Sequence, residues 1–257
     1  MSSHTWTPDA LWSERQNYRG TCWRLVEAQH RVSTLKLVDN LDEQALLEDI
    51  IEETKPNIPP ECQHLDYLFA TPFRYGAPYP YGSRFRRAGH TPGVYYASET
   101  APTALAEMVF YRFLFYAESP QTPWPDNAAE YTAIAARIQT SSGLDLTEPP
   151  LSDDAAAWAH KTDYSACQAL ADTARNTKLQ ALRYRSVRDP KGGANLAVLD
   201  CKAFEVAQPV DRRNWRIRIG AYGAQALQEH PRLNIEFGRQ AFDDPRISAL
   251  NWDRQAN

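Results

Sequence analysis

The spacing of apolar residues predicts an amphipathic helix in the first quarter of the chain. This helix is expected over 42–55, where apolar residues recur at helical intervals, and Pro56 ends it. Its apolar stripe consists of Leu46, Leu47, Ile50 and Ile51. Before the helix, the β-branched and aromatic residues of 21–27 predict a strand.

A segment rich in Pro, Gly and aromatic residues follows and leads into a strand and a long helix. The density of Pro and Gly in 65–93 predicts a structured loop system and makes a long regular element unfavourable. The sequence GVYYAS at 93–98 predicts a short buried strand. The Ser and Thr residues after it, with Pro102 in a first turn, predict that a helix begins here and continues through 103–118.

The second half of the chain predicts more strands than helices. Strands are expected over 130–139, 181–188, 195–200 and 214–220, and one or two helices in the Ala-rich stretch 152–178. The turn-forming sequence DPKGG joins the second and third of these strands. No internal repeat or linker interrupts the pattern, so we expect one domain of the α/β (α+β) class over 1–257.

Composition and charge restrict the classes of function. The 257 residues are 43% hydrophobic and 23% charged, with a formal net charge of −4, so no field over the whole molecule would recruit a polyanion. Any anion site must therefore be local. The sequence shows neither a secretory signal nor the roughly 18 consecutive apolar residues of a membrane span, so a cytoplasmic location is expected.

The cysteine and histidine residues do not form a metal-binding pattern. The four cysteines are scattered and none pairs in a CxxC motif, so reduced thiols in the core are expected. These cysteines are Cys22, Cys62, Cys167 and Cys201. The six histidines show no ligand spacing, and no metal is expected to be required.

The block 82–108 contains the first group of residues with candidate chemistry. It places Arg84 on a glycine-flanked loop, Tyr96 on a strand and Glu107 near the middle of an apolar helix. Each also has a purely structural interpretation: Arg84 as a surface arginine, Tyr96 as a core aromatic residue and Glu107 as a solvated helix residue. The helix neighbours of Glu107 are nevertheless mostly apolar, namely Ala104, Met108, Tyr111 and Leu114. The carboxylate therefore either lines a wet cleft or is hydrogen-bonded internally.

The block 181–200 contains a second candidate group. Ser186 lies between two arginines on a predicted strand, and Asn195 follows the glycine turn. A solvent-facing serine on a hairpin is the alternative interpretation. Ser186 has no Gly-x-Ser-x-Gly context, so a nucleophile elbow is not supported.

Taken in order, the sequences GSRF, VYYASET, ALAE and YRSVR–GGANLAVL resemble the RES domain over roughly residues 21–205. The family is named after an Arg, a Glu and a Ser, which correspond here to Arg84, Glu107 and Ser186. The resemblance implies a central mixed sheet flanked by helices, similar to ADP-ribosyltransferases. It would leave a helical insertion at about 40–60 and a C-terminal extension over 206–257.

The chain departs from the compact family pattern in two places. The family's Gly-Arg-Trp-Asn run resembles Ser83-Arg84-Phe85-Arg86 here, which keeps the aromatic residue and lacks the asparagine. The family also has an early arginine, often followed by an aromatic residue. Either Arg24, or Arg74 with Tyr75, matches it, and the sequence leaves both alternatives open.

The resemblance implies a NAD-degrading enzyme that acts as the toxin of a bacterial toxin–antitoxin pair. Cleaving nicotinamide from NAD develops positive charge on the ribose, so the site should combine guanidinium groups for the pyrophosphate, an aromatic ring and a carboxylate. Arg84 fits the first role and Glu107 the third. Tyr96, or Tyr95 on the opposite strand face, fits the second, and only one of the two should face the site.

The remaining expectations concern the other ligands and partners. Ser186 would position nicotinamide, ribose or phosphate through its hydroxyl, and Asn195 is expected at the substrate. NAD is the expected substrate and inorganic phosphate the co-substrate, with no cofactor. The expected partner is a helix-turn-helix antitoxin, and the oligomeric state, including a homodimer, is left open.

Two other functions compete with phosphorolysis of NAD. An ADP-ribosyltransferase would break the same bond and pass the product to a macromolecule. A nucleic-acid-binding module would instead use the arginine-rich sequences RFRR at 84–87 and DRRNWRIRIG at 211–220. The acidic net charge argues against this module, and the module would not explain Glu107.

Overall fold

The computed structural model describes residues 6–27, 37–74, 82–89 and 92–254. Its centre is an eight-stranded mixed sheet in the order β1-β2-β5-β4-β3-β6-β7-β8. The strands are β1 (Gln16–Glu27), β2 (Tyr95–Ser98), β3 (Ala129–Asp145), β4 (Ala181–Arg185), β5 (Ala194–Val198), β6 (Asp211–Gly220), β7 (Gly223–Gln228) and β8 (Leu233–Phe237). The expected mixed α/β fold is confirmed, because β3 and β4 pair in parallel and the other neighbours are antiparallel.

The long strand β3 divides the sheet into two parts. One edge of β3 pairs with β1, so the first five strands of the order close into a ring. Its other edge pairs with β6 at the start and with β4 at the end, so β6, β7 and β8 extend away from the ring. All five ring strands contribute side chains to one buried cluster.

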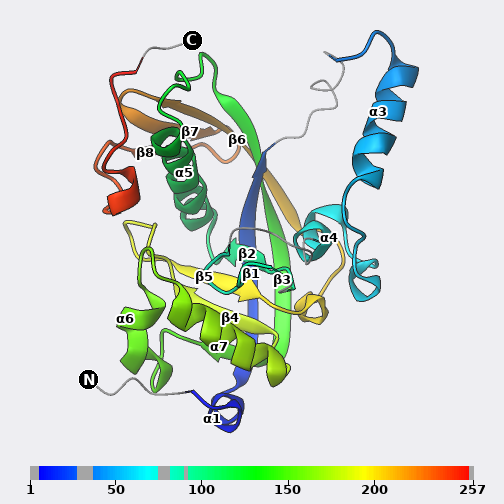
Figure 1. The fold of residues 1–257 in the computed structure, drawn as a ribbon, viewed down its shortest axis with the longest axis vertical. Helices are drawn as coiled ribbons and strands as arrows, with labels where there is room; N and C mark the ends of the chain where they lie inside the picture. The colour runs from blue at the N-terminus through cyan, green and yellow to red at the C-terminus, as the bar shows by residue number, and fades with distance from the viewer. Residues whose placement is uncertain (1–5, 28–36, 75–81, 90–91, 255–257) are drawn as a thin grey trace.

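Helices cover this sheet on both parts (Figure 1). The helices are α1 (Pro8–Ser13), α3 (Leu41–Glu53), α4 (Tyr67–Arg74), α5 (Ala101–Glu118), α6 (Ala155–Trp158) and α7 (Ser165–Asn176). Helix α5 packs Phe110 and Phe113 in one cluster with Trp215 of β6, whereas α7 packs Leu170 against Leu182 of β4. The described helices include none with the length and apolar character that a membrane span requires.

Helix α4 corrects the expectation of a loop over 65–93. Phe69 and Phe73 form an apolar face that is buried in the ring cluster, and this burial stabilises a helix that contains Pro72. Gly93 allows the close approach of the next segment, because a Cβ atom there would lie 2.0 Å from the Pro72 carbonyl oxygen. Tertiary packing therefore overrides the local signal of Pro and Gly.

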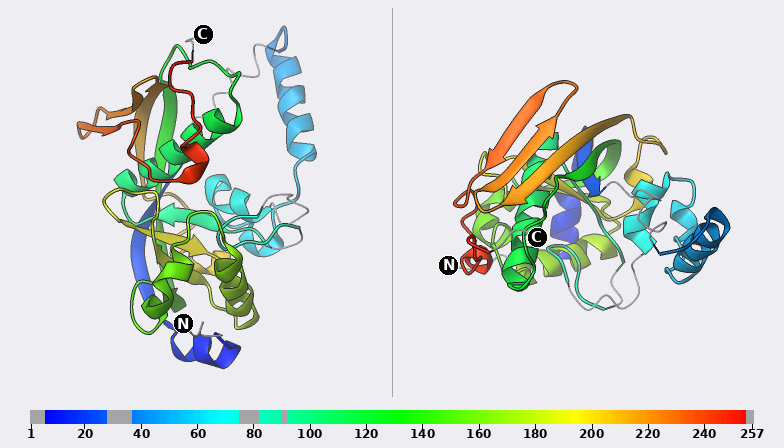
Figure 2. Two further views of the ribbon diagram at one scale, coloured as in Figure 1. Left: turned by 60° about the vertical axis from the view of Figure 1, so that its left-hand side comes forward. Right: turned by 90° about the horizontal axis from the view of Figure 1, so that it is seen from above.

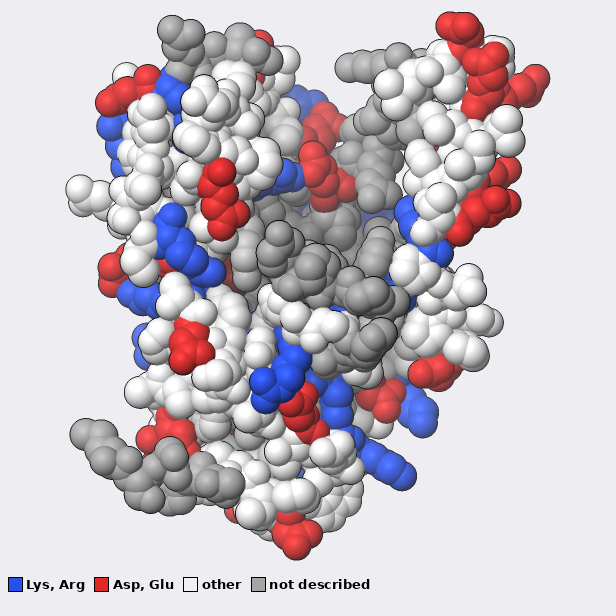
Figure 3. All heavy atoms as spheres, viewed as in Figure 1, with Lys and Arg blue, Asp and Glu red and all other residues white. Residues whose placement is uncertain are grey.

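Helix α3 confirms the helix expected over 42–55 but not its single apolar stripe. Leu47 and Ile51 are half-buried, whereas Leu46 and Ile50 are exposed. Helix α3 stands apart from the sheet in all views, and acidic side chains gather along it (Figures 1 to 3).

The other expected elements agree with the structure, except for one strand end and three elements that were not expected. The strand expected over 181–188 ends at Arg185, so Ser186 lies just after β4 and not in it. The four cysteines are free and buried, as expected. The prediction that 214–220 is the last strand is wrong, because β7 and β8 follow it as a meander. Their apolar residues, such as Ala224 and Phe237, face the cluster under α5. Helix α1 was also missed in the polar N-terminal segment.

Candidate active site

Helix α5 places Glu107 beside the ends of three strands. The helix begins as expected, because the Thr100 side chain accepts a hydrogen bond from the backbone N–H of Thr103 at 3.2 Å. The Thr103 hydroxyl donates to Asp189 in the β4–β5 turn at 2.9 Å. This contact fixes the start of the helix to the turn, and Glu107 lies half-buried about one turn later.

The Glu107 carboxylate is held through one of its oxygen atoms. The Ser186 hydroxyl and the Asn195 side-chain amide both donate to Oε1, each at 2.6 Å. Ser186 directly follows β4 and Asn195 lies in β5, and both side chains are buried. The structure thus brings together three predicted site residues. Within the described residues no group donates a hydrogen bond to Oε2.

The hydroxyl of Ser186 has no hydrogen-bonding capacity left. It donates to Glu107 and accepts from the backbone N–H groups of Arg188 at 3.2 Å and Asp189 at 2.9 Å. A serine hydroxyl offers one donor and two acceptor positions, and all three are filled. In this structure the Ser186 hydroxyl is thus directed to Glu107 and to the backbone, and its expected contact with the substrate stays a prediction.

Tyr96 holds the loop that carries Arg84. Its hydroxyl lies 2.8 Å from the Ser83 hydroxyl oxygen and accepts from the backbone N–H of Phe85 at 3.0 Å. Both contacts flank Arg84, so the position of the tyrosine fixes the position of the arginine.

Arg84 is a buried cation, so the alternative that it is a surface arginine is wrong. Its side chain is 8% exposed, and Nη1 donates to the carbonyls of Trp158 at 2.6 Å and His160 at 3.0 Å. Its guanidinium carbon lies 4.6 Å from the centre of the Tyr164 ring. In the described part of the chain no carboxylate pairs with Arg84, and Nε and Nη2 make no hydrogen bond.

The charges of Arg84 and Glu107 shift the pKa of Tyr184 in opposite directions. Burial raises the pKa of Tyr184, the negative charge of Glu107 raises it further, and the positive charge of Arg84 lowers it. A chain of contacts joins the two groups in one cluster: Arg84 lies over the Tyr164 ring, the Tyr164 hydroxyl accepts from the Arg188 side chain, and the Arg188 backbone N–H donates to Ser186, which binds Glu107.

Comparison with known proteins identifies the family. The family model described as "RES domain" matches residues 58–219, which include all the residues of this cluster named so far. The chain belongs to the RES domain family. No curated protein matches the sequence. One similar solved structure is the M. tuberculosis MbcT–MbcA toxin–antitoxin complex, with 16% identity, coverage of 80% of this chain and 87% of that chain, and a TM-score of 0.46.

The RES domain also contains residues near Glu107 that were not predicted to belong to the site. Ser98, at the end of β2, donates to the Asn195 Oδ1 atom at 2.7 Å. The alternation of side chains along a strand could have identified Ser98, because it lies two residues after Tyr96 and therefore on the same face of β2. Tyr111 follows Glu107 by one helical turn and is 53% exposed. Desolvation, the largest cause, and electrostatic interaction with Tyr164 and Glu107 raise the pKa of Tyr111.

The segment after the matched residues supports the RES site through Arg188. The buried guanidinium of Arg188 donates to the Tyr164 hydroxyl at 3.0 Å and lies 3.4 Å from an oxygen of Asp244. Burial tends to raise the pKa of Asp244, but hydrogen bonds from Arg246 and the charges of both arginines hold it below its ordinary value. No sequence signal linked residue 244 to this site.

Tyr95 and Arg24 lie on the opposite face of the sheet. Tyr95 is fully buried in the ring cluster, where it packs edge-on against Phe69. Tyr96 packs in a different cluster, so the two tyrosines lie on opposite faces of β2 as strand alternation predicts. Arg24 lies over the Tyr95 ring at 5.4 Å and donates to the Tyr96 carbonyl at 3.1 Å. The structure does not bring either residue to the cluster.

Arg74 forms a contact between helices. Its guanidinium donates to the Pro56 carbonyl at 2.7 Å and pairs with Glu52 of α3 at 2.7 Å. The structure therefore places it outside the Glu107 cluster. Tyr75 lies outside the described residues.

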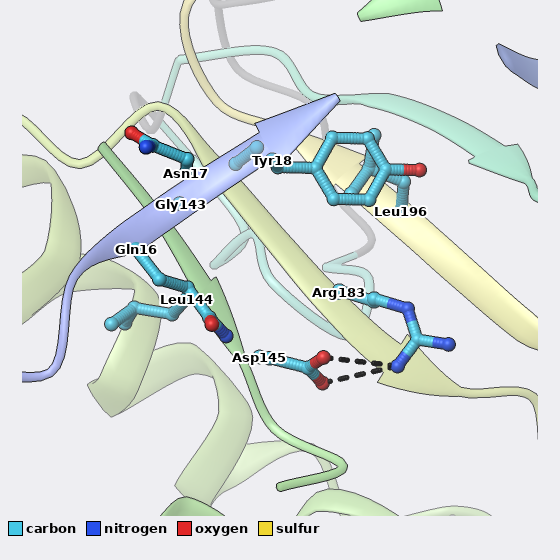
Figure 4. Close-up of a pocket in the computed structure, with 9 residues that line it drawn as sticks. Gln16, Asn17, Tyr18, Gly143, Leu144, Asp145, Arg183 and Leu196 are labelled. Atoms are coloured by element: carbon cyan, nitrogen blue, oxygen red, sulfur yellow. Dashed lines mark hydrogen bonds and ion pairs between the residues drawn. The ribbon is translucent and has the colours of Figure 1, made fainter. Parts of the chain in front are cut away.

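A small cavity of about 80 Å³ lies elsewhere, between β1, β3 and β4 (Figure 4). Arg183 in its wall pairs with Asp145 at 3.0 Å and with Glu99 at 2.8 Å. None of the predicted site residues lines this cavity. Because Arg183 pairs with both Asp145 and Glu99, we do not consider this cavity a second candidate site.

The arginine-rich sequences do not form one basic surface. In RFRR, Arg84 and Arg86 are buried and Arg87 pairs with Asp172. In β6, Arg212 lies 3.5 Å from Asp66, and Arg216 lies 3.7 Å from Glu130. The arrangement therefore disfavours the nucleic-acid-binding alternative.

Proposed function

We propose that this RES domain consumes NAD by cleaving the bond between nicotinamide and ribose. The observation that carries the proposal is a fixed carboxylate that a chain of contacts through Ser186, Arg188 and Tyr164 joins to a fixed guanidinium. Glu107 is held through Oε1, so Oε2 is free among the described residues. Arg84 is buried without a carboxylate partner in the same part of the chain. A dianionic pyrophosphate next to an electron-poor ribose matches these two charges.

Each group has a role in the proposed reaction. Nε and Nη2 of Arg84 bind the pyrophosphate, and Oε2 of Glu107 stabilises the positive charge that develops on the ribose. The bond between the anomeric carbon and the pyridinium nitrogen breaks, and nicotinamide leaves as a neutral base with the electron pair. An oxygen of inorganic phosphate then bonds to the anomeric carbon, and its proton is released to solvent. The products are nicotinamide and ADP-ribose-1''-phosphate.

Tyr96 and Tyr111 have different proposed roles. Tyr96 positions the Arg84 loop through its hydroxyl, since both hydrogen bonds of that hydroxyl go to the loop. The exposed ring of Tyr111 is the better candidate for contact with an aromatic ring of the substrate, because it lies one turn from Glu107.

The direct test is to incubate the purified protein with NAD, with and without phosphate, and to identify the products by phosphorus NMR and mass spectrometry. We expect faster loss of NAD with phosphate and a phosphorylated ADP-ribose. Label transferred to protein or nucleic acid would instead support the ADP-ribosyltransferase. An unchanged NAD pool, with folded protein at high concentration, would contradict the proposal.

We further propose that the protein acts as the toxin of a toxin–antitoxin pair, neutralised by a helix-turn-helix partner. Membership of the RES family supports this role. Expression without the partner should arrest growth because loss of NAD stops redox metabolism. Harmless high-level expression of an active enzyme would contradict the toxin role and leave the enzymatic proposal intact.

A further inference from the structure

Ser98 forms the outer end of a buried chain of hydrogen bonds that reaches Glu107. It is 2% exposed and lies directly opposite Asn195 in the pairing of β2 with β5. The Ser98 hydroxyl donates to Asn195 Oδ1 at 2.7 Å, and Asn195 Nδ2 donates to Glu107 Oε1 at 2.6 Å. The amide of Asn195, also 2% exposed, is thus bonded at both of its ends.

The hydroxyl of Ser98 holds the Asn195 amide in the orientation that donates a hydrogen bond to Glu107. Without this donor, the amide oxygen would be buried with no partner, which favours movement of the side chain away from its present position. A rotation of the amide by 180° would place Oδ1 against the carboxylate oxygen, where the two would repel. Only the observed orientation gives Oε1 a donor and Oδ1 a donor at the same time.

We infer that Ser98 is a positioning residue for Glu107: through Asn195 it reserves Oε1 for the protein and leaves Oε2 as the oxygen that meets the ribose. Ser186 completes the arrangement from the end of β4. The carboxylate is therefore fixed to three strand ends as well as to α5. This inference rests on the proposed NAD cleavage, because the positioning matters only if the carboxylate acts on a substrate.

Thr140 provides a matched control. Its hydroxyl is also buried and also donates to a side-chain amide oxygen, that of Gln180, at 2.6 Å. This bond lies on β3, and neither residue contacts Glu107. Ser98→Ala and Thr140→Val each remove one buried hydroxyl from an amide oxygen, and Thr140→Val also removes the acceptor of the Ser142 backbone N–H, so both should lower the denaturation midpoint. A purely structural role for Ser98 predicts the same kinetic behaviour for both variants.

The kinetic test compares these two variants with the wild type. Ser98→Ala should lower kcat about 10-fold or more with KM changed less than about 2-fold, because the loss is of transition-state and not of ground-state interaction. Thr140→Val should keep wild-type kinetics. An unchanged kcat in folded Ser98→Ala, or an equal loss in both variants, would overturn the inference.

If Ser98→Ala does not fold, a second variant tests the same chain of hydrogen bonds between Ser98, Asn195 and Glu107. Asn195→Asp places a carboxyl group against Glu107, and two carboxyl groups this close share a proton. The variant should work at acidic pH, where the new group is protonated and donates, and should lose kcat as pH rises through the neutral range. A pH profile equal to that of the wild type would contradict the inference.

A readout without turnover separates this inference from the proposed function. The NMR chemical shift of the Glu107 carboxyl carbon, measured at one neutral pH, should change in Ser98→Ala and stay at the wild-type value in Thr140→Val, because only Ser98 is linked to Glu107 through Asn195. If the wild type cleaves no NAD, the proposed function fails, and this chemical shift alone decides whether Ser98 positions the carboxylate. An unchanged chemical shift in Ser98→Ala would overturn the inference.

Discussion

The hydrogen bonds of single side chains assign different tasks to the residues singled out in the sequence. Among the described residues nothing donates to Oε2 of Glu107, which leaves it for the proposed contact with a substrate, whereas the hydroxyl of Ser186 is fully used. The sequence could identify both residues, because family motifs specify residue types. It could not predict the saturation of Ser186, which depends on two backbone N–H groups in a turn, or the burial of Arg84 under carbonyls 74 and 76 residues away.

Tyr111 should contribute to substrate binding, and Phe115 offers a matched control one turn further along α5. The two rings are 53% and 45% exposed, but only Tyr111 lies next to Glu107. Loss of a ring that stacks on a base costs about 1–3 kcal/mol. Tyr111→Ala should therefore raise the KM for NAD about 10-fold with a smaller change in kcat, and Phe115→Ala should leave both unchanged. Equal effects in steady-state kinetics would remove Tyr111 from the site.

At the scale of elements, local pattern predicted the strands and helices whose apolar residues repeat regularly. Helix α5 and strand β3 agree with it because cap residues and alternating apolar positions act locally. Helix α4 does not, since its stability comes from packing of Phe69 and Phe73 against distant strands. The ring closure by β1 and β3 also has no local signal, because it depends on pairing between strands about 100 residues apart.

The contact between α3 and α4 gives a prediction about Arg74. Arg74→Met keeps the apolar stem but removes the hydrogen bonds to Glu52 and Pro56, so unfolding should become easier by about 1–3 kcal/mol. NAD turnover per folded molecule should not change. Arg84→Met, measured beside it, should lose turnover. Loss of turnover in Arg74→Met with an intact denaturation midpoint would show that Arg74 serves the site after all.

At the scale of the whole molecule, the C-terminal segment outside the family match pairs with Arg188, whose backbone N–H binds the Ser186 hydroxyl. Asp244 is buried and is the carboxylate next to Arg188, and it also binds Arg246. Removing one partner of a buried ion pair typically costs about 3–5 kcal/mol, because the other charge remains buried. Asp244→Asn should therefore lower stability clearly at neutral pH.

The pH dependence of that loss follows from the lowered pKa of Asp244. The ionised carboxylate contributes stability above its unfolded pKa, and this contribution disappears as pH falls through the lower folded value. The difference in unfolding free energy between wild type and Asp244→Asn should thus be largest at neutral pH and shrink below about pH 4. Chemical denaturation across this range measures it, and a difference that grows in acid would contradict the assignment.

The central claim is that the Glu107 carboxylate stabilises positive charge on the ribose, and Glu107→Gln tests it most directly. The amide oxygen of glutamine can still accept from Ser186 and Asn195, so only the charge at the position of Oε2 is lost. We predict that NAD turnover falls by about 100-fold or more, whereas NAD binding and the denaturation midpoint change little. Wild-type turnover in a folded Glu107→Gln variant would contradict the account.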